Sequence, residues 1–383
     1  MWKRCSLIVC LTLSLQAYEN AFRVENSNFT LSQAAIPATV SDNAEERYLY
    51  NYNRLRIYDT LTFASFYTTA IVDLVNYAGE SYIGSPEFAY IEALEPDIPF
   101  DIHSDFHHYG SDQGAIYGKI HRLYGGYADE KHQVAVGIQK ISMGVGHIWT
   151  PTDLYNPKNA FALEPDEVYG VLAASYSYAL SALSTVQAIV SLREDESLKY
   201  GFRYKAFLGF ADLGVSFIYS DDIRMYGFEI EGDLFETGAQ WRSEGGYYRS
   251  NILDEAFYQA ILGFDYAFQN GINWTVEGYY SSETFTYTEQ LFYFKNELAA
   301  NLVHSNLYLG SSLSYDFDLA WSGALLVIAS LEDQIGSFAA PTLTYTVDDH
   351  HKVSVGSMLY FGEKESEFGA FGHTYYLNWK WSF

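Results

Sequence analysis

The sequence has 383 residues, with 48 Asp or Glu against 22 Lys or Arg, which gives a formal net charge of −26 at pH 7. This balance excludes nucleic acid as a partner, because phosphate neutralisation needs clustered Lys and Arg. Both cysteines, Cys5 and Cys10, lie near the N-terminus, so the rest of the chain has no disulfide framework, zinc–thiolate site or catalytic thiol.

The N-terminus has the pattern of a secretory signal peptide. Lys3 and Arg4 precede a mostly apolar run from Cys5 to Leu15, and Gln16 and Ala17 follow it. The run is too short to cross a bilayer as a helix. The pattern predicts a signal peptide over residues 1–17, and residues 18–383 are predicted to form a single domain.

Segments in which apolar and polar residues alternate recur along the chain. Alternation with period two is the pattern of strands with one apolar face, and an aromatic content of 18% is typical of membrane barrels. The predicted strands are 47–57, 61–74, 115–124, 133–142, 168–180, 185–193, 199–210, 213–220, 223–231, 234–243, 256–268, 272–280, 298–313, 318–330, 338–346, 353–361 and 371–383.

The connections between these segments alternate in length. Short turns, such as 58–60 and 269–271, are interleaved with long connections at 75–114, 143–167, 244–255, 281–297 and 362–370. Membrane barrels have short periplasmic turns and longer outer loops. Closure of an antiparallel barrel requires one further strand, which we expect within 20–42. The prediction is an all-β transmembrane antiparallel barrel of about 18 strands, with 16 as the alternative.

The first long connection contains a cluster of His and Asp residues over 101–108. Imidazoles and carboxylates this close could bind a transition metal, but their spacing matches no defined site. We therefore predict a polar outer loop with no metal and no cofactor.

Residues 143–167 are too rich in Pro and Gly for a strand and too apolar for a loop in water. They contain Trp149, Tyr155 and Phe161 beside three prolines, which predicts a loop folded into the barrel lumen. The stretch 148–157, after a strand like 136–141, resembles a segment of uncharacterised porin-like outer-membrane proteins. That resemblance implies a barrel and a channel. A structural plug or a surface flap is the alternative.

A pore constriction commonly sets loop acids against wall bases. The candidate acids on the loop are Asp153, Glu164, Asp166 and Glu167. The candidate bases on the wall are Lys119, Lys140, Arg203, Lys205 and Lys380, with Arg54 and Arg56 as further possibilities. For each of these residues, an ordinary solvated charge near a strand end is the competing interpretation.

Residues 348–351 read Asp-Asp-His-His, the residue types that outer-membrane proteases use. The alternation of connections places this turn at the periplasmic end, whereas those active sites face the cell exterior. We therefore predict that the chain is not an enzyme.

The last predicted strand has one aromatic and apolar face. That face carries Tyr375, Leu377, Trp379, Trp381 and the terminal Phe383. The pattern resembles the last strand of bacterial outer-membrane barrels, which the barrel-assembly machinery reads. The resemblance implies an outer-membrane location, contact with lipid and lipopolysaccharide and, by analogy with porins, a homo-trimer.

The function that these predictions favour is a porin-like channel for passive diffusion of small polar solutes or ions. Two alternatives stay open. One is a barrel transporter for hydrophobic compounds that uses the aromatic loop. The other is a surface adhesin or structural barrel that uses residues 75–114.

Overall fold

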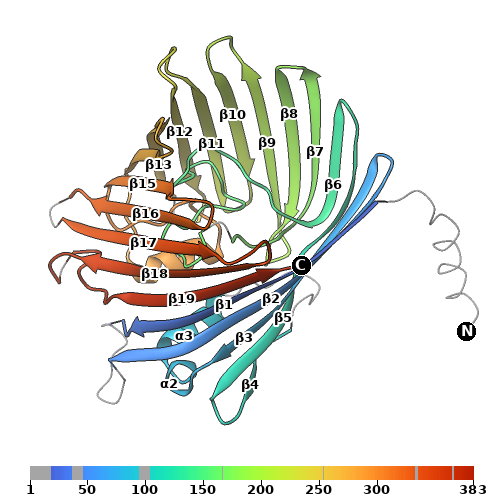
Figure 1. Cartoon of the computed structure of the whole chain (residues 1–383). Coiled ribbons are helices and arrows are strands. Elements are labelled where there is room, and N and C mark those ends of the chain that lie inside the picture. The colour runs from blue at the N-terminus through green and yellow to red at the C-terminus, as the bar shows by residue number, and fades with distance from the viewer. Residues whose placement is uncertain are drawn as a thin grey trace, which may run out of the picture.

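The strands of the protein form one closed sheet (Figure 1). The computed structural model describes residues 19–36, 46–94, 104–165, 167–252, 254–332, 335–364 and 366–383, without the side chains of 94, 287, 288 and 291. Its strands are β1 (Glu19–Ala34), β2 (Arg47–Phe63), β3 (Phe66–Ala78), β4 (His107–Tyr109), β5 (Gly114–Ala128), β6 (His132–Gln139), β7 (Val171–Ser181), β8 (Ser184–Leu192), β9 (Leu198–Phe207), β10 (Asp212–Tyr219), β11 (Ile223–Asp233), β12 (Ala239–Ser250), β13 (Ala256–Ala267), β14 (Asn273–Ser281), β15 (Leu307–Asp316), β16 (Trp321–Ser330), β17 (Gly336–Thr346), β18 (His351–Phe361) and β19 (Thr374–Ser382).

The sheet closes because β19 pairs antiparallel with β1, from Glu25 opposite Ser382 to Gln33 opposite Thr374. Of the 19 described strands, the three-residue β4 pairs only with β5. The remaining 18 form the wall, each antiparallel to its neighbours. The predicted antiparallel barrel of 18 strands is therefore confirmed, and β1 is the additional strand expected within 20–42. The signal peptide predicted over 1–17 lies outside the described residues.

The two faces of the wall differ in polarity, as alternation requires. On β19, Tyr375, Leu377 and Trp379 are each nearly half exposed on the outer surface. The intervening Tyr376 contacts Phe29 of β1, which is buried on the inner side. Large apolar side chains are exposed on nearly every strand of the barrel, which is the pattern of a wall that faces lipid.

The two ends of the barrel have different connections. Turns of two to five residues join β2 to β3, β5 to β6 and every later pair that ends on the same rim. The opposite rim carries the long connections 79–113, 140–170, 282–306 and 362–373. The short segments 193–197 and 220–222 also lie on that rim, as the predicted alternation required.

Two predicted connections were wrong because polar residues and glycines were read as turns. Strand β2 continues through the predicted turn 58–60 and ends at Phe63. Within that stretch, Asp59 pairs with Ala70 of β3. Strand β12 runs to Ser250, so most of the predicted connection 244–255 is strand. Its Gly245 and Gly246 are wall positions in register with β11 and β13.

A third error concerns the start of β15, which begins at Leu307 rather than at 298. The apolar stretch 298–303 belongs instead to a connection that contains α4 (Tyr287–Lys295) and packs inside the barrel mouth. The prediction failed because a loop whose apolar residues are buried has the same sequence pattern as a strand. Two further helices, α2 (Glu80–Ile83) and α3 (Pro86–Leu94), lie in the connection 79–113.

The described helices are short. None has the length and apolar character needed to span a bilayer.

Candidate functional site

The connection between β6 and β7, residues 140–170, lies inside the barrel (Figure 1). Three glutamates of the inner wall hold its backbone: Glu229 of β11, Glu244 of β12 and Glu277 of β14. Each is flanked on its own strand by residues that face outward. We call residues 140–170 the inner loop. Its position in the lumen confirms the prediction, made from its composition, that this segment folds into the barrel.

Glu244 makes the most contacts with the inner loop. One carboxylate oxygen accepts from the N–H groups of Val145 and Gly146 at 2.7 and 3.0 Å. The other accepts from the N–H and the hydroxyl of Thr152 at 2.7 and 2.8 Å. The carboxylate thus replaces water for three backbone donors and one hydroxyl that are buried within the barrel.

Glu277 accepts hydrogen bonds from the backbone of the next stretch of the inner loop. It accepts from the N–H groups of His147, Ile148 and Trp149 at 2.9, 3.1 and 2.8 Å. Arg242 of β12 also donates to Glu277, at 3.3 Å. Two wall carboxylates therefore bind the backbone N–H groups of five consecutive loop residues, 145–149, and of Thr152.

Wall glycines allow the inner loop to approach the sheet closely. A Cβ atom at Gly246 would lie 2.6 Å from the carbonyl oxygen of Pro151. At Gly310 of β15, a Cβ atom would lie 2.5 Å from the side chain of Ile148. These positions require glycine for space rather than for a turn, which explains why the sequence around 245–246 was misread.

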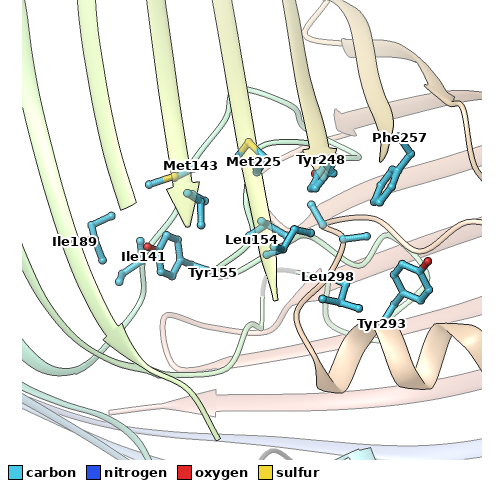
Figure 2. Packing of buried hydrophobic residues seen from close by; sticks show 14 of the residues in the cluster. Ile141, Met143, Leu154, Tyr155, Ile189, Met225, Tyr248, Phe257, Tyr293 and Leu298 are labelled. Atoms are coloured by element: carbon cyan, nitrogen blue, oxygen red, sulfur yellow. The ribbon is translucent and has the colours of Figure 1, made fainter. Parts of the chain in front are cut away.

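Apolar side chains of the inner loop complete the anchorage. Trp149 is 2% exposed and packs against Tyr279 and Tyr308, with ring centroids 5.3 and 6.0 Å apart. Figure 2 shows a second cluster, in which loop and wall side chains meet residues of the connection that carries α4. Its labelled members are Ile141, Met143, Leu154, Tyr155, Ile189, Met225, Tyr248, Phe257, Tyr293 and Leu298.

Two acidic residues in the second half of the inner loop contact strand β2, on the side of the barrel opposite the anchoring glutamates. Glu164 accepts from Arg54 of β2 at 2.8 Å, and Glu167 accepts from Arg56 at 2.9 Å. Arg56 also donates twice to Asp73 of β3, at 2.6 and 2.7 Å. The structure therefore brings two predicted loop acids against the two wall arginines named as further candidates.

The two acids differ in their titration. Burial raises the pKa of Glu164 above its ordinary value, although Arg54 opposes that effect. Burial also acts to raise the pKa of Glu167, but the guanidinium groups of Arg54 and Arg56 outweigh it and hold the pKa below the ordinary value. On acidification Glu164 takes up its proton first.

Asp153 has a different position from the other predicted acids. It is buried and accepts from the N–H groups of Met143, Tyr155 and Asn156 at 2.8 to 3.0 Å. Burial raises its pKa to about 6, against the lowering effect of these hydrogen bonds. Asp153 thus shapes the loop backbone and meets no predicted wall base. Asp166 lies outside the described residues.

The predicted wall bases are dispersed. Arg203 pairs with Glu229 and Lys205 with Glu231, on the side that holds the first half of the inner loop. Lys380 pairs with Glu25 of β1 at 2.9 Å. Lys119 lies over the rings of Tyr117 and Tyr169. Lys140 was predicted to lie on a strand of the wall. It is instead exposed just beyond Gln139, where β6 ends.

Sequence reasoning missed the three anchoring glutamates. The signal for them is a carboxylate at an inward position within a strand, which Glu229, Glu244 and Glu277 share. A single carboxylate in a strand does not specify a partner, because its ligand is loop backbone distant in sequence.

The connection 79–113 also turns toward the lumen. Tyr82, Ile83 and Phe88 from its two helices are buried against inward side chains of β2, β3 and β5, including Tyr50 and Tyr77. Of the proposed cluster 101–108, residues 101–103 lie outside the described residues, and His108 binds Glu92 at 2.7 Å. Among the described residues, no group of three or more His, Cys, Asp or Glu could hold a metal ion.

The turn at 348–351 has a structural role. Asp348 accepts from the N–H groups of His350 and His351, both at 2.8 Å, and so caps a tight turn between β17 and β18. The turn lies on the rim of short connections, as predicted.

The fold of the chain is similar to that of several solved structures. OccAB2 of Acinetobacter baumannii matches with a TM-score of 0.59 at 10% identity, and the outer membrane protein opdK of Pseudomonas aeruginosa with 0.58 at 8%. The fold is that of an outer-membrane porin. A BenF-like porin from Pseudomonas fluorescens Pf-5 also matches, with 0.58 at 8%. Each comparison covers 95% of this chain and 98% of the other. No family model and no curated protein matches this porin-fold chain in sequence.

Proposed function

We propose that this porin-fold protein is a channel in the bacterial outer membrane through which small polar solutes diffuse passively. The observation that carries the proposal is the inner loop, which wall glutamates hold inside a closed barrel. A wall of 18 strands encloses more space than its own side chains fill. A loop fixed inside the barrel narrows that space and so limits the size of the solutes that pass.

The constriction is proposed to lie where Glu164 and Glu167 of the inner loop meet Arg54 and Arg56 of the wall. There the loop acids and the wall arginines neutralise one another in direct ion pairs. The remaining predicted candidates contribute less, because Lys140 lies off the wall and Asp153 is buried in the loop interior.

A transporter for hydrophobic compounds is less well supported. It would use the aromatic part of the inner loop as an apolar site, but Ile148 and Trp149 are buried against Ile261, Tyr279 and neighbouring wall residues. The adhesin alternative would use residues 75–114. The described part of that segment packs α2 and α3 into the mouth of the barrel instead of projecting them outward.

The test is the conductance of the refolded protein in a planar lipid bilayer. Discrete steps would support a water-filled pore, and deletion of residues 145–165 should enlarge each step by removing the constriction. A deletion variant that folds, as shown by heat-modifiable migration on a gel, yet conducts like the parent would contradict a constriction by the inner loop. A parent that inserts and stays silent would contradict the channel itself.

The outward face of β19 supports the proposed assembly route. Tyr375, Leu377, Trp379 and Phe383 are each nearly half exposed or more, which leaves them accessible to the assembly machinery and then to lipid. Contact with lipopolysaccharide and formation of a homo-trimer stay predictions.

A further inference from the structure

Many of the charged side chains inside the barrel form ion pairs with an opposite charge. On one side Arg54 binds Glu164 and Arg56 binds Asp73. On the other side Arg203 binds Glu229, Lys205 binds Glu231, and Arg242 binds Asp265 and Glu277. Arg122 points its guanidinium at the main-chain oxygens of His121 and Val168.

Paired charges have a weak effect on a passing ion. The field of an unpaired charge falls off slowly in a space of low dielectric constant, whereas opposite charges within 4 Å of each other largely cancel at larger distances. Salt screens what remains over about 10 Å. The paired arrangement therefore gives the lumen little preference for anions or cations.

A separate part of the inner wall offers neutral hydroxyl groups. Thr342 and Thr344 of β17 share the face of Phe338, which contacts Phe161 of the inner loop. The Thr342 hydroxyl lies 2.8 Å from that of Tyr376, and the Thr344 hydroxyl lies 2.8 Å from that of Ser354.

Two further hydroxyl groups lie on the same inward face of neighbouring strands. Ser322 of β16 is opposite Thr344, and Ser312 of β15 shares the face of Gly310, where the inner loop touches the wall. The six side chains of this surface are all partly exposed: Ser312, Ser322, Thr342, Thr344, Ser354 and Tyr376. We call them the hydroxyl wall.

From these two observations we propose that the solutes of this channel are small, uncharged and rich in hydroxyl groups, such as monosaccharides and polyols. The proposal rests on the channel function proposed above. A neutral hydroxylated solute exchanges its hydrogen bonds with water for hydrogen bonds with the hydroxyl wall at little net cost. A carboxylate or an ammonium group loses hydration there that neutral hydroxyl groups replace only in part.

The first test is the swelling of liposomes that contain the refolded full chain, in glucose, gluconate and glucosamine of similar size. Glucose is expected to enter fastest, and the reversal potential in a KCl gradient is expected to lie near zero. Gluconate or glucosamine entering as fast as glucose would overturn the inference. Absence of swelling with all three solutes, together with absence of conductance, would instead overturn the channel function.

The second test removes hydroxyl groups without changing side-chain shape. The double variant Thr342→Val, Thr344→Val should slow glucose entry by about threefold or more, the effect of losing one ordinary hydrogen bond, and should leave KCl conductance as in the parent. Thr68→Val, on the outward face of β3, is the matched control and should change neither rate. Unchanged glucose entry in the double variant would overturn the role of the hydroxyl wall.

Discussion

The substitution Glu244→Gln tests whether wall carboxylates hold the inner loop. Each oxygen of the Glu244 carboxylate accepts two hydrogen bonds from the loop. In the glutamine variant an NH₂ group replaces one oxygen and faces two donors, so two bonds are lost. A hydrogen bond to a charged group contributes about 1.5–3 kcal/mol, which gives a loss of about 3–6 kcal/mol from the anchorage.

The barrel should survive this loss, because its interstrand ladders do not depend on the Glu244 side chain. The inner loop should detach locally, since Glu277 still holds the stretch from His147 to Trp149. We expect larger and noisier single-channel steps. We also expect faster cleavage within 140–170 by a protease added to the folded protein.

Glu231→Gln is the control for this experiment. Its carboxylate binds Lys205 of the wall at 2.6 Å, so its replacement should leave the inner loop resistant to protease. If Glu244→Gln conducts with the same steps and resists cleavage as well as the control does, the carboxylates do not hold the inner loop and the reasoning fails.

Three further predictions concern the inner loop and assembly. Because burial raises the pKa of Glu164, acidification should protonate it before Glu167, leave Arg54 with Glu167 as its acidic partner and shift the reversal potential toward anion selectivity; a shift toward cations would contradict the assignment. Trp149→Ala should cost about 3–5 kcal/mol and speed hydrogen exchange in the loop, whereas unchanged exchange would contradict its anchoring role. Phe383→Ala should lower the amount of heat-modifiable barrel in outer membranes, and a normal amount would exclude an assembly signal there.

The strand pattern is the part of the fold that the sequence predicted well. Alternation with period two is a local property, so the face of Tyr375 and Trp379 could be assigned outward without any partner strand. The alternation of short and long connections then required one further strand, which is β1. The composition of the inner loop, too apolar for water and too rich in Pro for a strand, indicated its position inside the barrel.

Tertiary structure alone decided what holds that loop and which charges meet. The ligands of Glu244 and Glu277 lie about 90 to 130 residues away in the chain and are backbone N–H groups, which every residue possesses, so no residue type marks them. The pair Gly245-Gly246 predicts a turn, whereas Gly246 is needed for space, because the carbonyl of Pro151 in the inner loop lies directly against it. The strands of the barrel follow from a local alternation of residues. The position of the inner loop depends on contacts that exist only once the wall has closed.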